Sequence, residues 1–115
     1  MSFRWPNKDP DETLDYSVDW SRFLGSATIN SVKWFVKSSQ YSTKTELGSG
    51  QTLTVASSSA TTDSIQNVSQ TNTTTVATIN IAGGQNNIQY TFSCQMTDDT
   101  GTTAERSIKL RVKER

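Results

Sequence analysis

The sequence contains no histidine, so it lacks the usual general base and the commonest metal ligand, and no Ser-His or Cys-His nucleophile pair can form. Its single cysteine, Cys94, excludes an internal disulfide and leaves too few soft ligands for a zinc site. We therefore expect a protein that is not an enzyme, that carries no cofactor and no metal, and that folds by packing alone.

Long apolar runs are also missing, because the longest strongly apolar run is Trp34-Phe35-Val36. A membrane span needs roughly 20 apolar residues, so none is expected, and the first residues lack the apolar stretch of a secretion signal. The 11 basic and 11 acidic residues give a formal net charge of zero. No overall field would draw the chain to nucleic acid or to an anionic membrane, and we expect neither as a partner.

Neutral polar residues dominate the composition. Ser, Thr, Asn and Gln supply 48 of the 115 residues, and 34 of these are Ser or Thr. Threonine favours strands, because its β-branched side chain fits a pleated sheet and loses rotamer freedom in a helix. The length is typical of a single domain with one core.

Apolar residues alternate with polar ones in five stretches, which is the pattern of strands that bury one face. The inward sets are Leu14, Tyr16, Val18 and Trp20; Val32, Trp34 and Val36; Thr75, Ala77, Ile79 and Ile81; Ile88, Tyr90, Phe92, Cys94 and Met96; and Ile108, Leu110 and Val112. Cys94, Trp20 and Trp34 lie in phase with these sets, so we expect all three to be buried.

The stretches between these strands contain turn residues. We expect a helical turn or bend at 21–25, a short strand at 27–29, and turns at 83–87 and 98–101. Residues 38–75 are weakly patterned, and short edge strands with long loops are the expectation there. About seven strands at this spacing predict an all-β, immunoglobulin-like β-sandwich over residues 14–115, preceded by an N-terminal arm and acidic turn at 1–13.

Charge is distributed unevenly between the two ends. Residues 1–20 carry a net charge of −3, and residues 104–115 carry +3. If the first strand lies beside the last, Asp15 and Asp19 would face Lys109, Arg111 or Lys113 across the strands. Alternatively, the basic last strand docks on an acidic partner.

The N-terminal arm has two large aromatic residues and no regular pattern. Trp5 either folds back over the end of its own domain or inserts into a neighbour as an aromatic anchor beside arginine. The candidate interface residues, from the arm and the last strand together, are Phe3, Arg4, Trp5, Lys109, Arg111 and Lys113.

Two groups of carboxylates would bind calcium only if they met at one end of the sandwich. They are Asp9, Asp11 and Glu12 near the start and Asp98 and Asp99 in the last hairpin. No twelve-residue calcium loop is present, and Asp is favoured in turns for local reasons. We therefore expect two separate turns.

The segment Lys8-Asp9-Pro10-Asp11-Glu12, followed by Leu14-Asp15-Tyr16 and Asp19-Trp20, resembles the start of the small fibre-tail adaptor proteins of short-tailed bacteriophages. The stretches 31–36 and 105–115 also resemble that family. The resemblance implies an immunoglobulin-like structural protein of the virion tail, assembled in the host cytoplasm. It would link or position the tail fibre on tail proteins (tail tube, nozzle or portal-adjacent adaptor), in multiple copies around the tail axis.

The family offers no catalytic residues. The alternative function is a carbohydrate-binding or adhesin-like module, because sugar-binding modules stack sugars on aromatic rings and the chain has three tryptophans.

Overall fold

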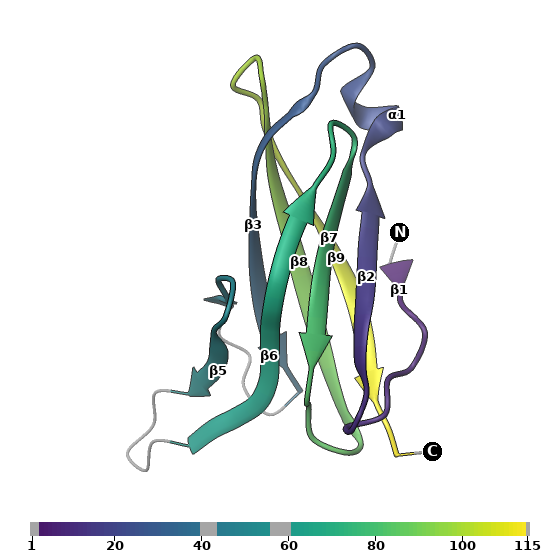
Figure 1. The fold of residues 1–115 in the computed structure, drawn as a ribbon, viewed down its shortest axis with the longest axis vertical. Helices are drawn as coiled ribbons and strands as arrows, with labels where there is room; N and C mark the ends of the chain where they lie inside the picture. The colour runs from purple at the N-terminus through teal and green to yellow at the C-terminus, as the bar shows by residue number, and fades with distance from the viewer. Residues whose placement is uncertain (1–2, 40–43, 56–60, 115) are drawn as a thin grey trace.

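Two sheets packed face to face make up the computed structural model, which describes residues 3–39, 44–55 and 61–114 (Figure 1). The five-stranded sheet has the order β1 (Phe3–Arg4), β9 (Thr103–Val112), β8 (Ile88–Asp98), β3 (Ile29–Ser38), β4 (Thr45–Glu46). The four-stranded sheet has the order β2 (Thr13–Asp19), β7 (Val76–Ala82), β6 (Thr61–Asn72), β5 (Thr52–Val55). One helical turn, α1 (Ser21–Leu24), follows β2. Within the described residues, no helix has the length and hydrophobicity that crossing a membrane requires.

The strand order confirms the predicted immunoglobulin-like sandwich. In that fold one sheet contains the order B-E-D and the other the order C-F-G. Here β2, β7 and β6 correspond to strands B, E and D, and β3, β8 and β9 correspond to strands C, F and G. The last two strands form a hairpin in continuous antiparallel register, from Ile88 beside Val112 to Thr97 beside Thr103.

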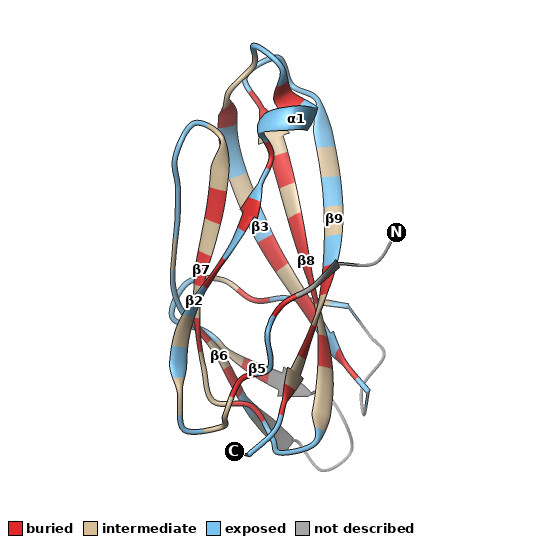
Figure 2. Cartoon of the chain, turned by 90° about the vertical axis from the view of Figure 1, so that its right-hand side faces the viewer, coloured by how far each residue is buried: buried red, intermediate tan, exposed pale blue. Residues whose placement is uncertain are grey.

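The core lies between the sheets and is lined by the predicted inward sets. Figure 2 shows buried residues alternating with less buried ones along β3, β7 and β8. Trp34 and Cys94 lie in register with one another and are completely buried, which confirms their predicted burial. Trp20, just after β2, is also buried, as predicted. The core is therefore continuous from one sheet to the other without a covalent bridge.

The expectation of only short edge strands and loops in residues 38–75 is wrong for the part of this stretch that the structure describes. β6 is 12 residues long and lies inside its sheet, between β7 and β5. Its pattern is hidden because a β-bulge shifts the register between Asn67 and Ser69, so that polar Asn67 points into the core. The Asn67 amide donates hydrogen bonds to Leu47 O (3.0 Å) and Gln70 Oε1 (2.9 Å). Residues 40–43 and 56–60 lie outside the described residues.

A tyrosine fixes the connection between β7 and β8. The backbone N–H of Gln85 donates a 2.9 Å hydrogen bond to the hydroxyl of Tyr90, near the start of β8. This is the tyrosine corner of immunoglobulin-like domains, in which a hydroxyl returns to the backbone a few residues upstream. The predicted turn at 83–87 is therefore anchored to the core.

We predict that Tyr90→Phe lowers the free energy of unfolding by about 1 kcal/mol, because the amide of Gln85 loses its acceptor. Urea denaturation measures the change. Tyr16→Phe is the matched control, since the hydrogen bond that the Tyr16 hydroxyl donates to Pro6 O is longer, at 3.5 Å, and therefore weaker. An equal loss in both variants would contradict the anchoring role.

Candidate functional site

The structure brings the two predicted groups of interface residues to one edge of the five-stranded sheet. β1 lies parallel to β9, with Phe3 beside Ile108 and Arg4 beside Lys109. The backbone N–H of Trp5 continues the ladder with a 2.9 Å hydrogen bond to Lys109 O. We call this region the β1–β9 edge, which consists of the six predicted residues Phe3, Arg4, Trp5, Lys109, Arg111 and Lys113.

Trp5 packs into the core of its own domain. Its side chain is 9% exposed and stacks on Tyr16, with ring centroids 4.7 Å apart. The rings of Trp34 and Phe92 lie 6.0 and 5.8 Å away. The indole N–H donates to Ser17 O at 3.3 Å. Of the two expected alternatives, the arm therefore folds back over its own domain, and Trp5 is not an exposed anchor in this structure.

Lys8 holds the end of the arm in place. Its side chain is completely buried, and Nζ donates hydrogen bonds to Gly83 O (2.6 Å) and Asp9 O (2.9 Å). Burial lowers the pKa of Lys8, and the nearby carboxylates of Glu12, Asp9 and Asp11 oppose that shift. Sequence reasoning gave Lys8 no role, because its acceptor at Gly83 lies in a turn 75 residues away.

Gly83 has a positive φ of 72°, and a Cβ there would collide with the backbone carbonyl of Ser64. The Gly83 carbonyl that accepts the hydrogen bond from Lys8 Nζ therefore belongs to a turn that requires glycine.

Lys109 and Arg111 of β9 point away from the core, as predicted, whereas Arg106 lies over the Trp20 ring. Ile108, Leu110 and Val112 are buried, whereas Lys109 and Arg111 are half-buried on the outer side. The exposed Lys113 follows the strand, and its backbone N–H donates to Lys8 O at 2.8 Å. The ion pair found among the described residues joins Lys44 Nζ to Glu105 Oε1 at 2.6 Å, and it involves none of the basic residues of the β1–β9 edge.

The predicted pairing of Asp15 and Asp19 with Lys109, Arg111 or Lys113 is wrong, although another basic residue of the last strand, Arg106, donates a 3.2 Å hydrogen bond from Nη1 to Asp19 O. The strand that contains both aspartates, β2, pairs with β7 in the other sheet. Asp15 accepts a 2.6 Å hydrogen bond from Asn80 Nδ2. The strand beside β9 is instead β1, which sequence reasoning missed because residues 3–8 show no alternation.

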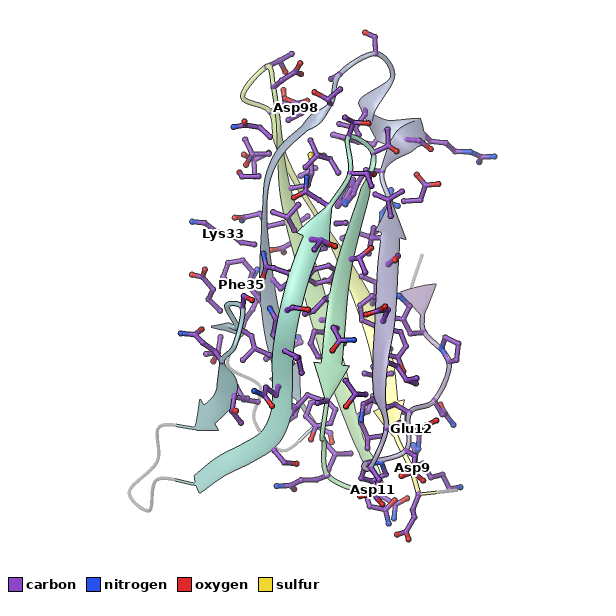
Figure 3. All side chains as sticks on the ribbon, in the orientation of Figure 1. Asp9, Asp11, Glu12, Lys33, Phe35 and Asp98 are labelled. Carbon is purple, nitrogen blue, oxygen red and sulfur yellow. The ribbon has the colours of Figure 1, made fainter. Side chains whose placement is uncertain are left out.

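The two groups of carboxylates lie at opposite ends of the sandwich (Figure 3). The ten residues of β9 separate them by roughly 30 Å, since a strand rises about 3.4 Å per residue. Asp9 Oδ1 accepts the backbone N–H of Asp11 at 2.9 Å, which makes a local turn. No group of three His, Cys, Asp or Glu residues in the described part of the chain is placed to hold a metal ion. The structure does not bring the calcium candidates together.

Asp98 organises the hairpin between β8 and β9. Its carboxylate accepts the Thr100 hydroxyl at 2.7 Å and the backbone N–H groups of Thr100 and Thr102 at 2.9 Å each. These hydrogen bonds, that of the Thr100 hydroxyl first, lower the pKa of Asp98.

Cys94 shows the opposite effect, because burial raises the pKa of its thiol to about 11. The thiol is therefore protonated at neutral pH, and it is too well buried to act as a nucleophile.

All three tryptophans are buried, so none presents a ring face on which a sugar could stack. Trp20 is covered by Arg106, whose guanidinium lies 4.7 Å above its ring, and by the edge of Phe23. Phe23 on α1 is 47% exposed and is one of two large hydrophobic residues exposed in the described residues.

One comparison with known proteins finds a match. Residues 8–111 match the family model described as "Podophage GP4 fiber-tail adaptor protein gp77". The match begins at Lys8 and covers most of the chain, including both sheets. No curated protein sequence matches the chain.

We predict that Trp5→Ala lowers the free energy of unfolding by about 3 kcal/mol, because it leaves a cavity against Tyr16, Trp34 and Phe92. The control is Phe23→Ala, an exposed aromatic whose loss should cost less than about 1 kcal/mol. Chemical denaturation compares the two variants. Equal losses would mean that the arm does not contribute to the core in solution.

We predict that Asp98→Ala lowers the melting temperature at pH 7 and that its difference from the unmodified protein narrows in acid. The folded-state pKa of Asp98 is lowered, so its stabilising contribution is complete above the unfolded pKa of about 4 and is lost as the pH falls through the folded pKa. Thermal melts from pH 7 to pH 2 measure the effect. Glu114→Ala, at an exposed position, should match the unmodified protein throughout; a pH-independent deficit in Asp98→Ala would contradict the assignment.

Proposed function

The chain belongs to the podophage GP4 fiber-tail adaptor protein gp77 family, and we propose that it links or positions tail fibres on the phage tail. Family membership makes it a structural component of the virion tail. The observation that carries the proposal is the family match over residues 8–111, which spans both sheets of the sandwich. Its partners in this proposal are tail proteins on one side and a fibre on the other, with several copies assembled around the tail axis in the host cytoplasm.

The mechanism is passive docking by a rigid body. A packed sandwich holds its surfaces in fixed relative positions, so two partners that bind different surfaces are held at a fixed distance and angle. Such a protein needs surfaces with hydrogen-bonding and charge complementarity rather than a catalytic cleft. The arm contributes to this rigidity, because Trp5 and Lys8 tie residues 3–8 to the sandwich.

The β1–β9 edge is the proposed contact with a tail or fibre protein. Arg111 and Lys113 lie at one end of this edge, and no ion pair between either of them and another described residue is found. Arginine and lysine in this situation are available to an acidic partner. Further along the same strand, from Thr103 to Ser107, no described strand pairs with β9 along its edge opposite β8. An extended segment of a partner could add its backbone to this part of the edge.

No specific observation favours the carbohydrate-binding alternative. It depended on exposed aromatic rings, and the three tryptophans are buried.

We predict that Arg111→Glu/Lys113→Glu abolishes co-assembly with the phage tail or fibre protein while leaving the melting temperature within about 2 °C, since surface charges contribute little to stability. Co-purification with separately produced tail and fibre proteins measures binding. The control is Arg22→Glu, an exposed arginine on α1 at the other end of the sandwich. Unchanged binding by the double variant would rule out this edge as the contact.

A further inference from the structure

Charge is separated between the two sheets. The strands of the four-stranded sheet contain three acidic residues, Asp15, Asp19 and Asp63, and no basic residue. The strands of the five-stranded sheet contain six basic and three acidic residues, a net charge of +3. The basic ones are Arg4, Lys33, Lys37, Arg106, Lys109 and Arg111, and the acidic ones are Glu46, Asp98 and Glu105. Arg106 is an exception, because its side chain lies over Trp20 and donates to Asp19 O of the other sheet. The remaining charges make one outer side of the body more positive and the other more negative.

The positive side has a flat centre on β3, β8 and β9. Lys33 and Lys37 are exposed on β3 with Phe35 between them, and Figure 3 shows Lys33 and Phe35 projecting outward. The register places Lys37 in line with Thr91 on β8 and Lys109 on β9. We call these five residues the basic face. Lys44 lies over it, with Nζ 4.9 Å from the centroid of the Phe35 ring.

The negative side is formed by the outward positions of β2 and β7. Ser17 and Thr78 share a 2.8 Å hydrogen bond across the two strands, and Asn80 donates to Asp15 in the next outward pair. We call these four residues, together with the exposed Asp19, the acidic face. Its side chains are short, and cross-strand hydrogen bonds hold four of them, so it is flat and ordered.

Within one copy, Arg106 of β9 lies beside Asp19, but the lysines of the basic face do not neutralise the acidic face. Packed sheets are about 10 Å apart, and side chains on their outer sides are farther from each other still. This separation exceeds the Debye length of about 8 Å at physiological ionic strength, so the attraction is screened. Between two copies, the same charges could approach to about 4 Å, where an ion pair forms.

We propose that the basic face of one copy docks on the acidic face of the next. The contact joins two different surfaces of the same chain, so it is heterologous and repeats from copy to copy, and it closes into a ring when the rotation between copies allows. This inference deepens the proposed function, because it rests on the multi-copy arrangement around the tail and names the surfaces that copies share.

The expected contact is weak in isolation. Three strands of about ten residues give a face of roughly 450 Å² per copy, below the roughly 800 Å² of a standard stable interface. Self-association should therefore appear at high protein concentration and low salt, and the tail would reinforce it in the virion.

A charge-swap experiment tests the proposal. One variant carries Lys33→Glu/Lys37→Glu, the other carries Asp15→Lys/Asp19→Lys, and circular dichroism checks that both fold. Sedimentation equilibrium at low salt measures the self-association constant of each variant, of the unmodified protein and of the two variants mixed in equal amounts. Glu114→Lys, a charge reversal at an exposed position outside both faces, is the control. If the second variant fails to fold, Asp15→Lys alone replaces it.

We expect each variant alone to associate at least about tenfold more weakly than the unmodified protein, because both of its faces then carry the same sign. The mixture should regain association to within about threefold of the unmodified protein, since each interface again joins opposite charges. An unmodified protein that stays monomeric at low salt would overturn the proposal, as would a mixture no tighter than the variants alone. The assay contains no tail or fibre protein, so such a failure leaves the result at the β1–β9 edge untouched.

Discussion

The packing around Trp34 is the interaction on which the rest of the structure depends. In antibody domains, the tryptophan of the corresponding strand packs against a disulfide between the two sheets. This chain has one cysteine, Cys94, which lies in register with Trp34 and is buried as a thiol. The N-terminal arm brings Trp5 to within 6.0 Å of Trp34, between ring centroids, and stacks it on Tyr16. A non-covalent contact thus ties the two sheets together.

The same arm determines which surfaces remain available for docking. Because β1 lies beside β9, the strand with the acidic residues, β2, belongs to the opposite sheet. Lys109 and Arg111 therefore lie on the opposite side of the domain from Asp15, whereas Arg106 of the same strand reaches across to Asp19 and donates to its backbone oxygen at 3.2 Å. A closed core with polar, oppositely charged outer faces suits a protein that holds other proteins at fixed positions, which agrees with its membership of the fiber-tail adaptor family.

The sequence predicted the strands whose inward residues are consistently apolar, and missed those whose pattern is broken. The alternation from Ile88 to Met96 identified β8 because one face of that strand is buried along its whole length. β6 was missed because the buried Asn67 replaces an apolar residue at a bulge. β1 was missed because its two residues are too few to show a period. The candidate edge was predicted as two separate sets, and only the parallel pairing of β1 with β9 could show that they meet.

The central claim is that residues 3–8 form an integral part of the sandwich. Amide hydrogen exchange measured by nuclear magnetic resonance tests it most directly, because the N–H groups of Trp5 and Lys8 donate to Lys109 O and Arg111 O. We expect these two amides to exchange as slowly as those in the β8–β9 hairpin. Exchange of both amides at the rate of an unstructured peptide, with the hairpin still protected, would contradict it.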